Sequence, residues 1–145
     1  TCRSAVVASP EYLRRHGEPK HPDELAHHAC LAYSLTSRSN WAFIIAGAPH
    51  FVEISGPLTA NNGNALQDAA LQGMGILYEP TFIAAEAIRA GTLVPILKDF
   101  QTPVLDVFAV FPGTRFVPQR VRTFVDFLAA RLGPEPYWDR GLDLG

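Results

Sequence analysis

The stretch that decides the fold spans residues 61–80 and reads NNGNALQDAALQGMGILYEP. Its leucines and alanines recur at helical spacing, which predicts a helix over residues 65–72. Asparagines that can cap this helix precede it, and two glycines that can end it follow. Residues 76–78 then predict a short buried strand, and Pro80 begins a second helix that extends to about residue 89. This alternation of helices and strands is typical of an α/β fold.

The part of the chain before this stretch also alternates short strands with short helices. Turn-forming Gly, Pro, Asn and Ser residues separate apolar runs of four to six residues, which is the length of ordinary strands. We expect strands over residues 4–9, 30–33 and 58–60, an antiparallel hairpin from residues 41–45 and 51–54, and short helices over residues 10–16 and 23–28.

The part after residue 91 contains one strongly β-prone segment and one amphipathic helix. Residues 104–111, VLDVFAVF, have a single polar member and predict a central strand. Pro118 begins a helix with one apolar stripe, formed by Val121, Phe124, Val125, Leu128 and Leu132. We expect residues 134–145 to form a tail held, if at all, by Tyr137 and Trp138.

Length and composition indicate an ordinary soluble domain. The chain has 145 residues, of which 48% are hydrophobic and 18% charged, so it can bury a core without disulfides or metals. Its net charge is -2 and it has no basic block, which argues against direct nucleic-acid binding. No apolar run reaches the roughly 20 residues of a membrane span, and we expect no membrane partner.

Neither catalytic nor metal-binding signatures are present in the sequence. The two cysteines, Cys2 and Cys30, lack metal-ligand spacing, and the five histidines are not arranged for a shared ion. We interpret Cys2 as incidental, Cys30 as a core residue, and the histidines as surface residues. With no secretory leader at its start, the chain predicts a reducing, cytoplasmic setting, and its first residues indicate a piece of a longer protein. We expect no cofactor, no metal and no enzymatic activity.

One location remains as a candidate binding site. A strand followed by the Asn61–Asn62–Gly63–Asn64 turn places a helix N-terminus, with its free N–H groups, at one sheet edge. Tyr78 and Glu79 end another strand, and ligands of open α/β sheets bind at the carboxyl ends of strands. The alternative is that an asparagine only caps the helix and Tyr78 only packs.

Four motifs in this order resemble the C-terminal effector-binding part of LysR-type transcriptional regulators, over residues 4–133. They are A-S-P-x-Y-L with G-x-P-x-x-P-x-x-L, N-x-x-A-x-x-x-A-x-x-x-G-x-G-I followed by Pro80, G-T-L-V at residues 91–94, and R-V-R-x-F-V-D-F-L at residues 120–128. The resemblance implies a Rossmann-like lobe of the periplasmic-binding-protein type, with hinge strands at residues 5–8 and 104–110. In this family a small effector binds between two such lobes and shifts the geometry of a homo-oligomer.

The resemblance also implies which residues face the effector. They are Ser9, Ser34, Asn61, Asn62, Gly63, Asn64, Tyr78 and Glu79. Ser9 and Ser34 would form hydrogen bonds, the asparagine turn would donate from amides, and Tyr78 and Glu79 would stack or accept. Glu79 departs from the apolar residue usual in the family, and it would disfavour an anionic effector and favour a polar or basic one.

The chain departs from the family in what it lacks. The winged helix-turn-helix through which the family contacts DNA is absent, as is most of the first lobe. We therefore divide the chain into a second regulatory lobe with its hinges (residues 1–112), a helix of the missing lobe (113–133) and a tail (134–145). The helix would expose its apolar stripe, so we predict dimer or swapped contacts there. Two alternatives remain: a solute-binding lobe of a transport system, and a small hydrolase that uses Ser34 or Ser37 with a histidine.

Overall fold

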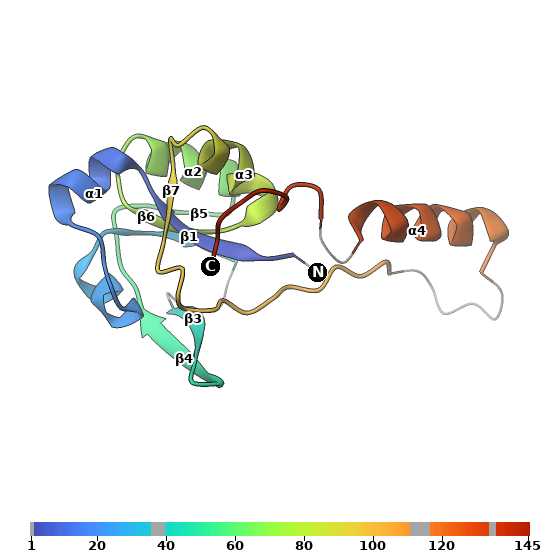
Figure 1. The fold of residues 1–145 in the computed structure, drawn as a ribbon, viewed down its shortest axis with the longest axis horizontal. Coiled ribbons are helices and arrows are strands. Elements are labelled where there is room, and N and C mark those ends of the chain that lie inside the picture. The colour runs from blue at the N-terminus through green and yellow to red at the C-terminus, as the bar shows by residue number, and fades with distance from the viewer. Residues whose placement is uncertain (1, 36–39, 111–116, 134–135) are drawn as a thin grey trace.

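The central sheet has five strands, and the order in which they pair decides where the site lies. The structure is a computed structural model that describes residues 2–35, 40–110, 117–133 and 136–145. The strand order is β5-β2-β6-β1-β7 (Figure 1), formed by β1 (Ser4–Ala8), β2 (Cys30–Tyr33), β5 (Thr59–Ala60), β6 (Ile76–Pro80) and β7 (Val94–Ile96). The strands β2, β5 and β6 are parallel, whereas β1 is antiparallel to both of its neighbours.

Helices and a hairpin cover the two faces of this sheet. On one face α2 (Gly63–Leu71) and α3 (Thr81–Arg89) pack against Ala5, Val7 and Leu77. The other face carries α1 (Pro10–His16), the 3-10 helix η1 (Pro22–His27) and the hairpin of β3 (Asn40–Ile45) and β4 (Ala48–Glu53). Because successive side chains of a strand point to opposite faces, a strand such as β1 with all five residues buried requires both covers.

The α/β organisation expected from the sequence is confirmed, and most element bounds agree within two residues. The helix and strand predicted from the deciding stretch are α2 and β6, with Asn62 as the N-cap of α2. Cys2 is a correction, because it is not incidental: its side chain is 3% exposed, as buried as a core residue. Within the described part of the chain, no helix combines the length and apolarity that a membrane span needs.

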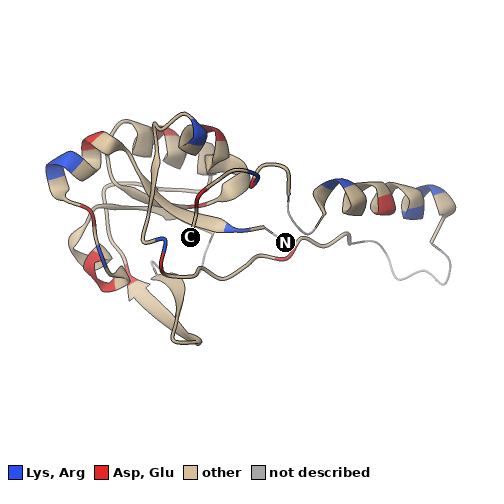
Figure 2. Cartoon of the chain, viewed as in Figure 1, with Lys and Arg blue, Asp and Glu red and all other residues tan. Residues whose placement is uncertain are grey.

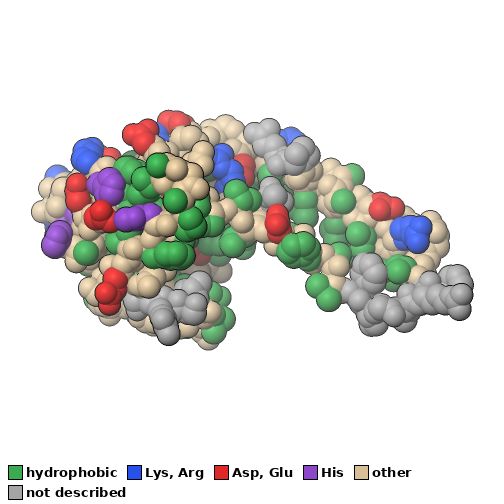
Figure 3. All heavy atoms as spheres, turned by 90° about the horizontal axis from the view of Figure 1, so that it is seen from below, with side chains coloured by type: hydrophobic (Ala, Val, Ile, Leu, Met, Phe, Trp, Pro, Cys, Tyr) green, Lys and Arg blue, Asp and Glu red, His purple; other side chains and the backbone are tan. Residues whose placement is uncertain are grey.

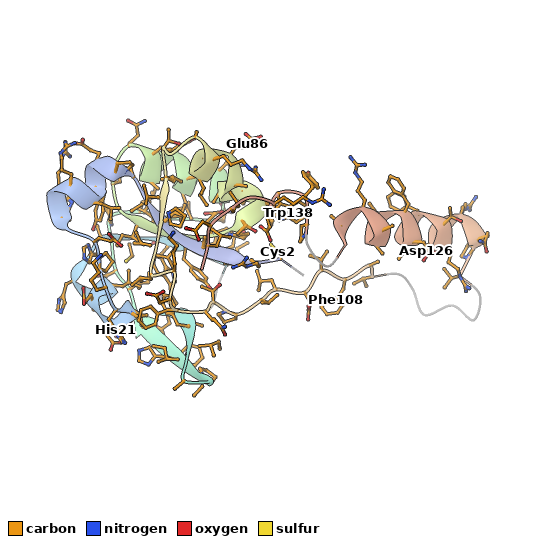
Figure 4. The ribbon with its side chains drawn as sticks, viewed as in Figure 1. Cys2, His21, Glu86, Phe108, Asp126 and Trp138 are labelled. Carbon is orange, nitrogen blue, oxygen red and sulfur yellow. The ribbon has the colours of Figure 1, made fainter. Side chains whose placement is uncertain are left out.

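The prediction of a central strand over residues 104–111 is wrong. Of this segment the structure describes residues 104–110, which run as extended chain with a single antiparallel bridge, between Leu105 and Cys2. The hinge strand expected at residues 104–110 is therefore not a member of the sheet. Its apolar side chains are exposed, Phe108 by 77% and Val110 by 91%, and Figure 4 shows Phe108 on the extension that leads away from the lobe. High β propensity reflects packing against neighbouring strands, and in the described chain this segment has only the bridge at Leu105.

The helix α4 (Gln119–Leu132) forms as the sequence predicts but stands apart from the lobe (Figure 1). None of its residues is buried, and Phe124 of its apolar stripe is 60% exposed. The charged residues of the helix are Arg120, Arg122, Asp126 and Arg131. Figure 2 shows the basic and acidic positions along α4. Seen from below, apolar side chains gather along the extension and α4 (Figure 3). The dimer or swapped contacts expected at the apolar stripe of α4 stay a prediction.

The C-terminal residues fold back onto the lobe. The Arg89 guanidinium donates to the carbonyl oxygen of Trp138 at 2.6 Å, and Lys98 pairs with Asp143 at 2.6 Å. The Trp138 ring meets Phe82 edge-on, with centroids 6.1 Å apart, and Figure 4 shows Trp138 near Cys2 at the start of β1. Tyr137 is 58% exposed, so the tail is held by Trp138 and these polar contacts.

Candidate functional site

The candidate site lies at the sheet edge where the three parallel strands end. Because β2, β5 and β6 share one direction, their carboxyl ends meet at the same edge. The antiparallel strand β1 brings its first residue to that edge, where Ser4 pairs with Pro80. The turn at residues 61–62 and the first residue of α2 lie there as well, because they follow β5 directly. The edge therefore collects polar strand ends and a helix N-terminus.

A cavity of about 400 Å³ is present at this edge. It is lined by Ser4, Tyr33, Asn40, Trp41, Ala42, Gly63, Tyr78, Glu79, Pro80, Phe82, Ile83, Pro103 and Leu105. These residues come from β1, β2, β3, α2, β6, α3 and the segment after β7. Predominantly apolar walls with a few polar groups are typical of small-molecule sites, and the volume falls within their usual range.

Tyr78 forms the aromatic wall of the cavity. Its ring stacks on Trp41 with centroids 5.6 Å apart and packs against Phe43 at 6.2 Å. Its hydroxyl donates to the carbonyl oxygen of Ala42 at 3.5 Å, and the side chains of Thr102 and Ser4 also reach it. Burial raises the pKa of Tyr78, so the hydroxyl is neutral and can act as a donor. The hairpin is held over the site by these contacts.

Glu79 is the buried carboxyl of the cavity. The residue is 3% exposed, and burial raises the pKa of its carboxyl to about 7. The carboxyl lies against Gly63 at the start of α2, where a Cβ would come within 3.0 Å of both Glu79 Oε1 and Ile83 Cδ1. A larger residue at position 63 would therefore have to displace the Glu79 carboxyl or the end of the Ile83 side chain. Glu79 is therefore placed where a bound group could donate to it or carry an opposite charge.

The predicted site residues separate into three groups. Gly63, Tyr78 and Glu79 line the cavity, as expected. The three asparagines lie at its edge without lining it, and the Asn62 side chain accepts from the Ala65 N–H at 3.3 Å as a helix cap. Asn62 therefore acts as a helix cap, which is the alternative that the sequence left open for one asparagine of this turn. Asn61 and Asn64 are exposed.

The two serines lie outside the cavity. Ser34 is exposed in the turn after β2, where its N–H donates to the carbonyl oxygen of Ala60 at 2.9 Å. Ser9 lies at the opposite edge of the sheet, because β1 runs antiparallel to β6. Its side chain is 3% exposed and accepts from the Tyr12 N–H at 3.2 Å as the N-cap of α1. Ser9 caps α1 in this structure, and its contact with an effector stays a prediction.

Sequence reasoning missed most of the aromatic lining of the cavity. Trp41 belongs to a hairpin that the sequence predicts without its position over the sheet, and Tyr33 and Phe82 were assigned no role. The positions of these residues could have indicated their role. Tyr33 ends a strand and Phe82 lies at the start of a helix, both at the same sheet edge as Tyr78. Aromatic residues at such positions can line a ligand site as well as a core.

The histidines have structural partners. The Tyr12 hydroxyl accepts from the Ala29 N–H at 3.0 Å and forms a hydrogen bond of 3.1 Å with His28 Nδ1. Burial lowers the pKa of His28 and so favours the neutral ring. His50 pairs with Asp23 at 2.6 Å. Within the described residues, no group of three or more His, Cys, Asp or Glu side chains could hold a metal ion.

A second hollow, of about 470 Å³, lies on the other side of the start of β1. It is lined by residues 3–6 and 95–102, together with Val104, Leu144 and Gly145. Its basic groups are already engaged, since Arg3 donates to the carbonyl oxygen of Gly145 at 3.1 Å and Lys98 pairs with Asp143. It lies at the carboxyl end of β7, which runs parallel to β6 because both strands are antiparallel to β1. We retain the aromatic cavity as the candidate site because Gly63, Tyr78 and Glu79 line it.

Comparison with known proteins identifies the family. The family described as the LysR substrate binding domain matches residues 1–133. An HTH-type transcriptional regulator of Xanthomonas campestris pv. campestris (strain 8004) is 36% identical over 135 residues, which cover 90% of this chain and 39% of the relative. The regulator CrgA of Neisseria meningitidis serogroup B is 38% identical over 134 residues, covering 90% of this chain and 44% of CrgA.

Solved structures agree with this assignment. The full-length structure of AphB, a virulence activator of Vibrio cholerae and a member of the LTTR protein family, matches with a TM-score of 0.77 and 28% identity. The match covers 89% of this chain and 44% of AphB. The structure of CrgA, a LysR-type transcriptional regulator, matches with a TM-score of 0.71 and 36% identity over 91% of this chain and 45% of that protein. The chain therefore spans less than half the length of these relatives. It belongs to the LysR substrate-binding domains, which are parts of transcriptional regulators and not enzymes.

Proposed function

We propose that this chain is the effector-sensing lobe of a LysR-type transcriptional regulator. A small metabolite binds in the cavity at the carboxyl ends of β2, β5 and β6, between this lobe and a second one. The observation that carries the proposal is the cavity itself, in which residues from six helices and strands and from the segment after β7 meet at the edge where α/β folds bind ligands. Three of its lining residues, Gly63, Tyr78 and Glu79, are those that the family resemblance selects.

The effector acts by shifting an equilibrium between two arrangements of a homo-oligomer. Such a shift requires that the effector bind one arrangement more tightly than the other. The exposed apolar stripe of α4 is the face through which this chain contacts its neighbour, either a first lobe or a second copy. DNA is contacted only through a winged helix-turn-helix outside this chain. The cytoplasmic setting stays a prediction.

The test is a thermal-shift screen of the full-length regulator against a panel of metabolites. A ligand at about 100 times its dissociation constant stabilises the folded protein by about 2.7 kcal/mol, and its effect grows with the logarithm of its concentration. We expect at least one such compound, and we expect Trp41→Leu to weaken it while Phe51→Leu, at an exposed position of the same hairpin, does not. A compound that stabilises the wild type and Trp41→Leu equally would show that effector binding takes place elsewhere.

A further inference from the structure

The described lining of the cavity lacks the cationic side chains that a site for an anionic effector would offer. It contains four aromatic rings, those of Tyr33, Trp41, Tyr78 and Phe82. It contains one carboxyl, that of Glu79, and among the described residues no Lys, Arg or His. We propose that the effector is an organic cation, an amine on an aromatic or aliphatic body, whose charge is held by Glu79. This inference rests on the function proposed above.

Aromatic rings and a carboxyl together are the chemistry that recognises an ammonium group. A cation placed over the face of Trp, Tyr or Phe is attracted by the negative face of the ring, and the attraction grows when water is excluded. The Trp41–Tyr78 stack, with an angle of 27° between the rings, supplies extended ring surface at one side of the cavity. Phe82, whose side chain is 55% exposed, supplies further ring surface from α3. These rings can hold the body of the ligand and contribute to holding its charge.

Glu79 supplies the counter-charge. The carboxyl is buried, and burial is what raises its pKa to about 7, so the charged form is held back by desolvation. A ligand ammonium in the cavity would compensate this desolvation, because an opposite charge at short distance favours the ionised carboxyl. A carboxylate ligand would meet the reverse situation, since it would bring a second negative charge into a site whose described lining offers no cation.

The nearest alternative for an anion is the N-terminus of α2, where the Glu79 carboxyl would repel it. The Glu79 carboxyl lies against Gly63, the first residue of this helix. The Asn62 side chain satisfies the N–H of Ala65 in the same turn. Arg3 and Lys98 line the other hollow and are engaged with Gly145 and Asp143 there. Arg3 and Lys98 are thus engaged outside the cavity, and the N-terminus of α2 lies beside a carboxyl that would repel an anion.

A matched pair of probes tests the inference on the full-length regulator. Phenethylamine and 3-phenylpropionate have the same ring and the same two-carbon spacer but carry opposite charges. Their dissociation constants can be measured by isothermal titration calorimetry, together with 2-phenylethanol as the neutral reference. We expect the amine to bind about tenfold more tightly than the acid or more, with the alcohol between them.

Two variants assign that preference to one residue. Glu79→Gln keeps the size of the side chain and removes the charge, and we expect it to abolish most of the preference for the amine. Glu86→Gln makes the same chemical change on the exposed face of α3, and we expect it to leave the preference intact. The inference is overturned if the acid binds as tightly as the amine, if neither probe binds at millimolar concentration, or if Glu79→Gln retains the preference. An anionic metabolite from the thermal-shift panel that depends on Trp41 would overturn this inference and leave the proposed function standing.

Discussion

Replacing Glu79 by Gln should stabilise the folded protein at neutral and alkaline pH. Burial raises the pKa of the Glu79 carboxyl from its ordinary value of 4.5 to about 7. The folded state therefore holds this proton over a range in which the unfolded state has released it, and wild-type stability falls as the pH rises through that range. At about 1.4 kcal/mol per unit of pKa, the full cost above pH 7 is about 3 kcal/mol. Solvent at the cavity mouth reduces this to about 1.5–3 kcal/mol.

Urea denaturation of the wild type and Glu79→Gln at about pH 4 and about pH 8 measures this cost. Near pH 4 the carboxyl is protonated in both states, so the two proteins should have similar free energies of unfolding. Near pH 8 the variant should be the more stable one. Glu86→Gln, at an exposed site on α3, should show no such divergence. Equal stabilities at the higher pH, or a less stable Glu79→Gln there, would show that the native carboxylate has a stabilising partner and would refute the reasoning.

Three further predictions concern other parts of the fold. Gly56→Ala should destabilise the protein by about 2–3 kcal/mol in urea, because the new Cβ would overlap the backbone of Cys30; an unchanged urea midpoint would contradict the close approach. Tyr12→Phe should lower the free energy of unfolding by about 1–3 kcal/mol, because the buried hydroxyl is the acceptor for the Ala29 N–H and also bonds to His28. An unchanged free energy of unfolding at pH 8 would contradict this. Replacing Phe124 by Gln should weaken self-association in light scattering, and an unchanged mass would exclude the α4 stripe as the contact.

Local sequence patterns were sufficient for the elements that form from short-range signals. The helix α2 has its cap, its apolar spacing and its glycine stop within residues 61–75, so the chain encodes both its ends locally. The strand β6 follows directly, and the position of Tyr78 and Glu79 at its end was predictable because ligand sites of α/β folds gather at such edges. Both residues line the cavity, and their contact with an effector stays a prediction.

The rest depended on contacts between distant segments. Residues 104–110 have the composition of a central strand, yet their one described pairing is the bridge between Leu105 and Cys2, so the composition alone was misleading. Ser9 was assigned to the cavity because the direction of β1 relative to β6 is not encoded in either strand. The aromatic cover from Trp41 requires the hairpin to fold over the sheet, and the sequence predicts the hairpin but not where it docks.

The decisive measurement is a crystal structure of the full-length regulator bound to a compound found in the thermal-shift screen. We expect the compound to lie between the Trp41–Tyr78 stack and Phe82, with its basic group at Glu79. A compound bound instead in the hollow lined by Arg3 and Lys98, with the aromatic cavity empty, would contradict it.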